Sequence, residues 1–229
     1  MKKTTGYLFA IICICGLLGC TAATSSETTI AQPEQSKLSE QSEITALTED
    51  ELAYFNGDSF FNRDSFDVRN QFLSSLYSRP EEINLYELFY NGADTREQIE
   101  GDELADVIKG SGMSCSVEDL PCPCTKISRF EMDEVLMANM GITLAQTDGL
   151  GLDGFVYLSE YDSYYHIHGD TNFAMEITFS RGEREGDLIR LFYSDIFYGD
   201  GNKVLTLKVT DGGYLFVSNQ LDNSETAAD

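Results

Sequence analysis

The stretch VLTLKVTDGGYLFVS, residues 204–218, contains two short apolar runs on either side of Asp211-Gly212-Gly213. In both runs the apolar residues recur with a period of about two, as they do in a half-buried strand. Glycine and aspartate are typical of the tight turns that join neighbouring strands. The stretch therefore predicts a β-hairpin.

Residues after Leu150 continue this pattern toward the N-terminus. Six short apolar runs predict strands, namely Phe155–Leu158, Tyr164–His168, Ala174–Phe179, Leu188–Tyr193, Val204–Val209 and Tyr214–Ser218. Turn formers such as Arg181-Gly182-Glu183 and Gly199-Asp200-Gly201-Asn202 separate several of them. We expect neighbouring strands to pair antiparallel, as a meander.

Residues 44–147 instead have mainly helical periodicity. Five helices are predicted. The first begins at Thr48, the second runs from Val68 to just before Pro80, and the third covers Ile83–Phe89. The fourth includes Leu104–Ile108 and ends at Gly110, and the fifth runs from the Ser128 capping box to Gly141. Helices followed by strands predict an α+β fold, with N-terminal helices packed on a C-terminal antiparallel sheet of about six strands. This element order resembles that of NTF2-like cones.

The pattern of the first 20 residues predicts a targeting signal. Lys2 and Lys3 precede an apolar run that ends in Leu17-Leu18-Gly19-Cys20. These four residues resemble the lipobox of bacterial lipoproteins. The resemblance implies that residues 1–19 are a cleaved signal peptide, that Cys20 carries diacylglycerol, and that the mature chain faces outward from the cell membrane. The alternative is an ordinary secretory signal with an incidental cysteine.

Composition divides the rest of the chain. Residues 20–43 begin with the lipidated Cys20 and continue as a Ser, Thr, Gln and Glu linker, which we expect to be disordered because it cannot bury a core. Residues 44–221 form the predicted single α+β domain, helical over 44–147 and sheet over 153–219. We expect the tail 222–229 to be disordered too.

The folded part also resembles uncharacterised lipoproteins of gut bacteria. The features that carry this resemblance are the stretches Tyr164–Thr171 and Gly213–Asn219. No activity is known for those proteins. The resemblance therefore implies a location and no reaction.

The charge of the chain is strongly negative. It has 15 basic and 39 acidic residues, a net charge of −24, and loss of Lys2 and Lys3 leaves 13 basic and 39 acidic residues, or −26. Nucleic acid is excluded as a partner because phosphate binding needs basic patches. The charge leaves divalent cations and basic proteins as reasonable partners.

Both histidines of the chain lie in His166-Ile167-His168-Gly169-Asp170. Alternate residues of an extended segment point the same way, so both imidazoles and the Asp170 carboxylate form a candidate metal site. The spacing resembles the first part of the metallo-β-lactamase motif, but Thr171 stands where that motif has a histidine, which excludes the family. The alternative, which we favour, is that both are ordinary sheet residues.

Cys115, Cys122 and Cys124 are the thiols that remain once Cys20 is lipidated. A structural disulfide that involves Cys115 and one of the other two is the favoured interpretation in an oxidising compartment, whereas a zinc site is the alternative. Acidic turns such as 148–154 allow calcium, but ordinary turn chemistry explains them better. We predict no cofactor, with Zn²⁺ or Ca²⁺ as alternatives.

A group of tyrosines lies near two acids. Tyr157, Tyr161, Tyr164 and Tyr165 accompany Glu160 and Asp162. They could form an aromatic platform for sugar or peptide, although such a group is more often sheet core with hydroxyls at its rim.

The function predicted from these observations is a non-enzymatic binding or interaction module of the cell envelope, with an envelope protein, peptide or glycan as partner. The alternative is a metal-dependent hydrolase that uses His166, His168 and Asp170. No catalytic residue is assigned, because the chain has no serine nucleophile elbow, phosphate-binding glycine loop or dinucleotide fingerprint.

Overall fold

The computed structural model describes residues 42–61, 67–93, 99–169, 177–195 and 201–223. The chain divides into two units, Met1–Glu40 and Gln41–Asp229, and all described residues belong to the second unit. The predicted signal peptide, Cys20, most of the linker and the tail therefore lie outside the described residues.

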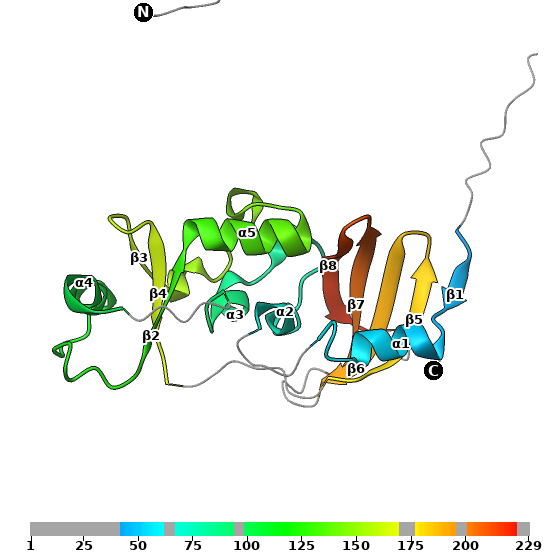
Figure 1. Cartoon of the computed structure of the whole chain (residues 1–229), viewed down its shortest axis with the longest axis horizontal. Coiled ribbons are helices and arrows are strands. Elements are labelled where there is room, and N and C mark those ends of the chain that lie inside the picture. Colours follow the sequence, from blue (N-terminus) through cyan, green and yellow to red (C-terminus); the bar gives the residue numbers. More distant parts are fainter. Residues whose placement is uncertain (1–41, 62–66, 94–98, 170–176, 196–200, 224–229) are drawn as a thin grey trace, which may run out of the picture. The chain divides into compact units, whose positions relative to one another are not determined.

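The helices occupy mainly the N-terminal part of the described chain (Figure 1). The α-helices are α1 (Glu49–Asn56), α2 (Val68–Gln71), α3 (Leu85–Phe89), α4 (Gly101–Ser111) and α5 (Arg129–Met140). Short 3₁₀ helices are η1 (Pro80–Glu82), η2 (Leu144–Gln146) and η3 (Leu152–Gly154).

The strands form two antiparallel sheets, with the orders β1-β5-β6-β7-β8 and β2-β4-β3. The strands are β1 (Ile44–Ala46), β2 (Cys124–Ser128), β3 (Val156–Leu158), β4 (Ser163–Ile167), β5 (Phe179–Glu185), β6 (Leu188–Asp195), β7 (Gly201–Thr210) and β8 (Gly213–Leu221). Strands β5 to β8 pair in chain order. The predicted α+β class is therefore confirmed, as is the meander over these four strands.

The single sheet of about six strands is not formed. Strand β4 pairs with β3 along one edge and with β2 along the other, so both of its edges are occupied. The sequence does not predict β2 or β1, and β1 pairs with β5. The first half of the predicted run Ala174–Phe179 lies outside the described residues, and its last residue, Phe179, begins β5. Two separate sheets also differ from the one curved sheet of an NTF2-like cone.

The turn predicted at Arg181-Gly182-Glu183 is wrong, because these residues lie inside β5. A Cβ atom at Gly182 would lie 2.5 Å from Cδ1 of Leu47, and the main-chain N–H of Leu47 donates to the Gly182 carbonyl at 2.9 Å. This glycine therefore allows a close approach of two segments rather than a turn.

The predicted end of α4 at Gly110 is also wrong. Gly110 lies inside the helix, and a Cβ atom there would lie 2.7 Å from Cγ1 of Val156 on β3. The helix ends instead at Gly112, which has φ of 74° and so adopts the left-handed conformation that glycine favours. The first glycine allows α4 to approach β3, and the second ends the helix.

The helix predicted from Val68 ends early, at Gln71. Farther along, Tyr77 pairs with Asn219 of β8 through two main-chain hydrogen bonds of 2.9 Å. The Asn219 amide also donates to the Ser75 carbonyl at 2.9 Å. These bonds at the sheet edge hold residues 75–77 in place of a longer helix.

Helix α5 begins and ends where the sequence predicts. The Ser128 hydroxyl accepts from the Glu131 N–H at 3.1 Å, and the Glu131 carboxylate accepts from the Ser128 N–H at 2.7 Å. Gly141 ends the helix at φ of 71°. Met132, Leu136 and Met140 form its buried side.

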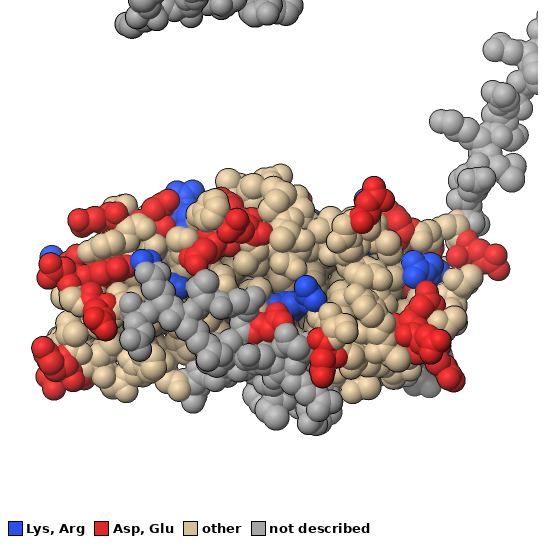
Figure 2. Space-filling view, in the orientation of Figure 1, with Lys and Arg blue, Asp and Glu red and all other residues tan. Residues whose placement is uncertain are grey.

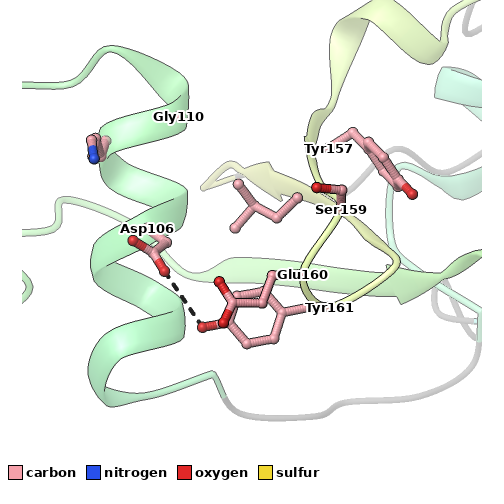
Figure 3. A pocket seen from close by; sticks show the side chains of 8 residues that line it. Asp106, Gly110, Tyr157, Ser159, Glu160 and Tyr161 are labelled. Atoms are coloured by element: carbon pink, nitrogen blue, oxygen red, sulfur yellow. Dashed lines mark hydrogen bonds between the residues drawn. The ribbon is translucent and has the colours of Figure 1, made fainter.

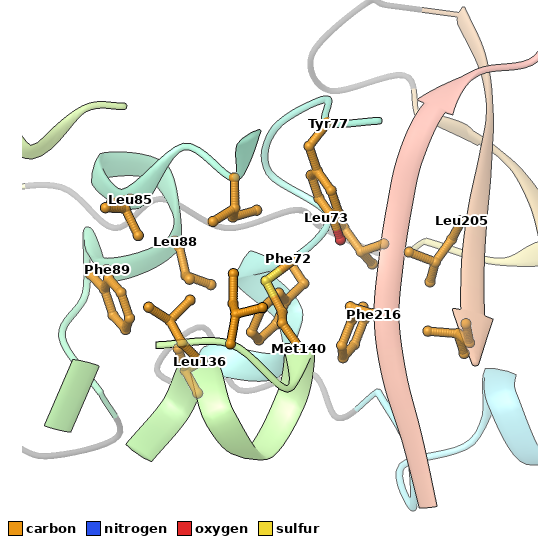
Figure 4. Close-up of a cluster of buried hydrophobic side chains, with 14 of the residues drawn as sticks. Phe72, Leu73, Tyr77, Leu85, Leu88, Phe89, Leu136, Met140, Leu205 and Phe216 are labelled. Atoms are coloured by element: carbon orange, nitrogen blue, oxygen red, sulfur yellow. The ribbon is translucent and has the colours of Figure 1, made fainter. Parts of the chain in front are cut away.

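One large core joins the helices to the five-stranded sheet (Figure 4). The rings of Phe72 and Phe216 stack with centroids 4.4 Å apart, and α5 packs against both β8 and β2. A second, smaller cluster comprises Ile99, Leu104, Val107, Ile108 and Tyr165, and it attaches α4 to the three-stranded sheet.

Replacement of Phe216, which is 1% exposed, should measure the dependence of the fold on the large core. Phe216→Ala removes a buried ring and leaves a cavity, so the free energy of unfolding should fall by about 3–5 kcal/mol in urea denaturation. Phe130→Ala is the matched control, because Phe130 is 68% exposed. It should change the free energy of unfolding by less than about 0.5 kcal/mol. Equal losses would contradict the assigned core.

Candidate functional site

The two histidines lie together beside α3. His166 belongs to β4 and His168 follows that strand, so both imidazoles lie on one side of it, as the alternation predicts. Their ring centroids are 4.6 Å apart and their planes differ by 12°, a stacked pair. Asp170, the third predicted ligand, lies outside the described residues.

Hydroxyl groups occupy one nitrogen of each imidazole. Nε2 of His166 lies 2.7 Å from the Tyr86 hydroxyl, and Nε2 of His168 lies 2.9 Å from the Thr125 hydroxyl. The Tyr90 ring contacts both imidazoles, with centroids 4.7 and 4.5 Å away. The pair therefore joins α3 to the three-stranded sheet.

A metal role for these histidines stays a prediction. Within the described ranges, no group of three or more His, Cys, Asp and Glu side chains is placed to hold a metal ion. Nδ1 of His166 is buried and has no hydrogen bond of good geometry among the described residues, and the Tyr90 main chain lies close enough to affect the pKa of the ring. The hydrolase alternative and the His166, His168 and Asp170 ligand set are not tested, because Asp170 is not described.

Burial, together with a smaller effect of the neighbouring His168, lowers the pKa of His166 to about 4, and a hydrogen bond with the Tyr90 main chain acts in the opposite direction. At neutral pH the His166 imidazole is therefore uncharged. Depending on its tautomer, the neutral ring either accepts a hydrogen bond from the Tyr86 hydroxyl at Nε2 or donates one from Nε2 to the hydroxyl oxygen.

The stability of the protein should fall in mild acid because of His166. His166 takes up a proton near pH 6.5 in the unfolded chain and only near pH 4 in the folded chain. The contribution of the neutral imidazole to the free energy of unfolding is therefore fully present above pH 6.5 and is lost as the pH falls toward 4. Because the ring is only half-buried, we expect a modest loss of about 1 kcal/mol between pH 7 and pH 5.

Urea denaturation of the native chain and of His166→Gln at both pH values measures this loss. Glutamine does not titrate, so the variant should lack this part of the pH dependence, whereas the carboxylates contribute equally to both chains. Equal pH dependence of the two chains would show that the His166 pKa is not lowered.

The three cysteines are free thiols in this structure, and each is partly exposed. Burial raises the pKa of Cys124 to about 11, with smaller effects from Glu103 and Cys122. The Cys124 thiol is therefore protonated at neutral pH, which disfavours it as a nucleophile or metal ligand. The predicted disulfide among Cys115, Cys122 and Cys124 stays a prediction.

An open cleft of about 390 Å³ lies between α4 and the β3–β4 hairpin (Figure 3). Its volume falls in the lower range of small-molecule sites. The residues that line it are Asp106, Lys109, Gly110, Tyr157, Leu158, Ser159, Glu160 and Tyr161. Neither histidine lines it.

The carboxylates of the cleft come from two elements. Asp106 projects from α4, and Glu160 lies in the turn after β3 (Figure 3). The Tyr161 hydroxyl donates to Asp106 Oδ2 at 3.5 Å, a long hydrogen bond. Burial raises the pKa of Tyr161, and the charges of Asp106, Glu160 and Glu103 raise it further. The electrostatic potential at this hydroxyl is therefore negative.

A second carboxylate of α4, Glu103, connects the helix to the three-stranded sheet beneath the cleft. Glu103 Oε1 accepts from the Tyr165 hydroxyl at 2.5 Å and lies 3.0 Å from Nζ of Lys126. Tyr165 is fully buried, so α4 is tied to β4 and β2 through polar groups as well as through apolar contacts. This arrangement fixes Asp106, one turn farther along α4.

The tyrosines of the sequence cluster separate in the structure. Tyr157 and Tyr161 line the cleft, whereas Tyr165 is buried beneath α4 and Tyr164 packs against the large core. The Tyr157 hydroxyl donates to Asp162 at 2.7 Å. The predicted platform is therefore two tyrosines with Glu160, and the sequence misses Asp106 and Lys109 because they lie about 50 residues away.

Comparisons with protein families, with curated proteins and with solved structures found no match for this chain. Among the helices of the described residues, none is both long and apolar enough to cross a membrane.

Proposed function

We propose that this chain is an extracytoplasmic lipoprotein, anchored through Cys20, whose domain binds an envelope component or extracellular ligand without catalysis. The cleft between α4 and the β3–β4 hairpin is the proposed binding site. The observation that carries this proposal is the group of Tyr157, Tyr161, Asp106 and Glu160 around one open volume.

The side chains that line the cleft are of types that bind and orient a small polar ligand. Tyrosine presents a broad ring and a polar hydroxyl, and carboxylates accept hydrogen bonds in defined directions. Such groups fix the orientation of a small ligand in a concave site. Nucleic acid does not suit the site, because acidic side chains gather over α4 and β3 (Figure 2).

The sequence of the N-terminus supports the anchor. A lipobox-like Leu17-Leu18-Gly19-Cys20 precedes a polar linker, which would hold the domain away from the bilayer. Two acyl chains on one cysteine suffice for stable membrane attachment, whereas one chain does not.

The anchor makes a direct prediction for cell fractionation. The native full chain, expressed in a bacterium, should sediment with membranes and carry a diacylglyceryl mass on Cys20. Cys20→Ser should leave that modification out and move most of the protein into the soluble fraction. Cys115→Ser, a matched control, should stay with the membranes. Membrane retention of Cys20→Ser without lipid would favour an uncleaved apolar segment instead.

The cleft can be tested by obstruction. Ligand-observed NMR with a panel of amines, amino sugars and short peptides should find binders of the full chain. Ser159→Trp places a large ring at the cleft and should weaken these binders about tenfold or more. Ala138→Trp is the control, because Ala138 lines a separate hollow of about 490 Å³ on α5.

Two outcomes would contradict the cleft as the site. Loss of binding in Ala138→Trp but not in Ser159→Trp would move the site to α5. Turnover of a panel member, detected as a product in the same spectra, would contradict a non-enzymatic role.

A further inference from the structure

Two of the residues that line the cleft, Asp106 and Glu160, carry carboxylates. Within the described part of the chain, neither Asp106 nor Glu160 forms an ion pair. Their hydrogen bonds are also few. Among the described residues, Asp106 accepts the long hydrogen bond from Tyr161, and Glu160 accepts none from a protein group. Each carboxylate can accept several hydrogen bonds, so both have acceptor positions that a ligand can take in exchange for water.

Lys109 also lines the cleft, where it is the basic residue among the lining side chains. Its side chain is exposed in the last turn of α4, where a positive charge is stabilised by the C-terminal end of the helix dipole. It lies within 4.0 Å of no carboxylate among the described residues. Lys109 therefore leaves the two carboxylates available to an external cation.

Apart from Ser159, the remaining residues that line the cleft are apolar or aromatic. Leu158 packs against the smaller core cluster, and the ring of Tyr161 lies beside it. A tyrosine ring face attracts a cation, and a short methylene chain can pack against leucine. A metal ion fits less well, because two carboxylates fall short of the oxygen ligands that Ca²⁺ or Mg²⁺ requires.

We propose that the cleft binds an aliphatic primary ammonium group, held between Asp106 and Glu160 with its methylene chain against Leu158 and Tyr161. This inference rests on the proposed binding function of the same cleft. An ammonium group has three N–H donors and no acceptor, which suits two carboxylates that form no ion pair among the described residues. The group could come from a free amine or from a lysine side chain of a peptide.

Isothermal titration calorimetry of the full chain in detergent tests the proposal. The probes are 1,5-diaminopentane, Nα-acetyl-lysine amide, the neutral isostere 1,5-pentanediol and N-acetylglucosamine. We expect the diamine to bind with a dissociation constant of about 1 mM or lower and both neutral probes to bind at least tenfold more weakly. If the lysine amide binds as tightly as the diamine, the ammonium group comes from a lysine side chain of a peptide. If it binds more weakly, the ligand is a free amine.

Charge-neutralising variants localise the effect. Asp106→Asn and Glu160→Gln should each weaken the diamine about tenfold, whereas Glu134→Gln, which removes an exposed charge on α5, should not. Lys109→Met should tighten the diamine about two- to threefold, because a like charge is removed, and should not affect a neutral ligand. Thermal unfolding of each variant checks that it is folded.

The outcomes separate the ligand class from the binding function. Equal weakening by Glu134→Gln would mean attraction to the overall charge and would overturn the ammonium site. N-acetylglucosamine or pentanediol could bind more tightly than the diamine and lose this binding in Ser159→Trp. That result would show that the ligand is not an ammonium compound and would leave the cleft as a binding site. Absence of diamine binding would overturn the ammonium site. The proposed binding function is decided separately, by the NMR ligand panel with the native chain and Ser159→Trp.

Discussion

Ser128 is the residue on which the arrangement of the domain depends. It is the last residue of β2, where it pairs with Ser163 of β4, and it is also the N-cap of α5. Strand and helix are therefore joined without a loop, and the capping box fixes the direction in which α5 leaves the sheet. Because α5 packs against β8, this junction attaches the three-stranded sheet to the large core.

The same junction places the cleft. The N–H of Arg129 donates to the Asp162 carbonyl at 3.1 Å, so the start of α5 holds the turn that contains Glu160 and Tyr161. The alternation of β4 then sends Tyr165 toward α4 and His166 toward α3. One strand of five residues thus supports both the cleft and the stacked imidazoles.

Local signals predicted what local interactions decide. The capping box at Ser128 and the glycine at 141 predicted α5, and the apolar runs around Asp211-Gly212-Gly213 predicted the β7–β8 hairpin. Features that depend on tertiary contacts were missed. Gly110 reads as a helix end, yet it is the point of contact with β3, and Asp106 carries no signal that relates it to Tyr161. Division into two sheets follows from β2, whose five residues contain a lysine and two hydroxyl side chains and so lack a strand pattern.

The position of the cleft also has an energetic consequence. The cluster that attaches α4 has five buried members, whereas the core around α5 has many more, so α4 has the smaller share of apolar stabilisation. Its remaining attachment is polar, through Glu103 to Tyr165 and Lys126. A ligand that contacts both Asp106 and Glu160 would join α4 to the β3–β4 turn directly. Binding would then strengthen the attachment of α4, because a ligand that binds only the folded form adds to its stability. A site between α4 and the hairpin is therefore one where occupancy can change the order of the domain as well as hold the ligand.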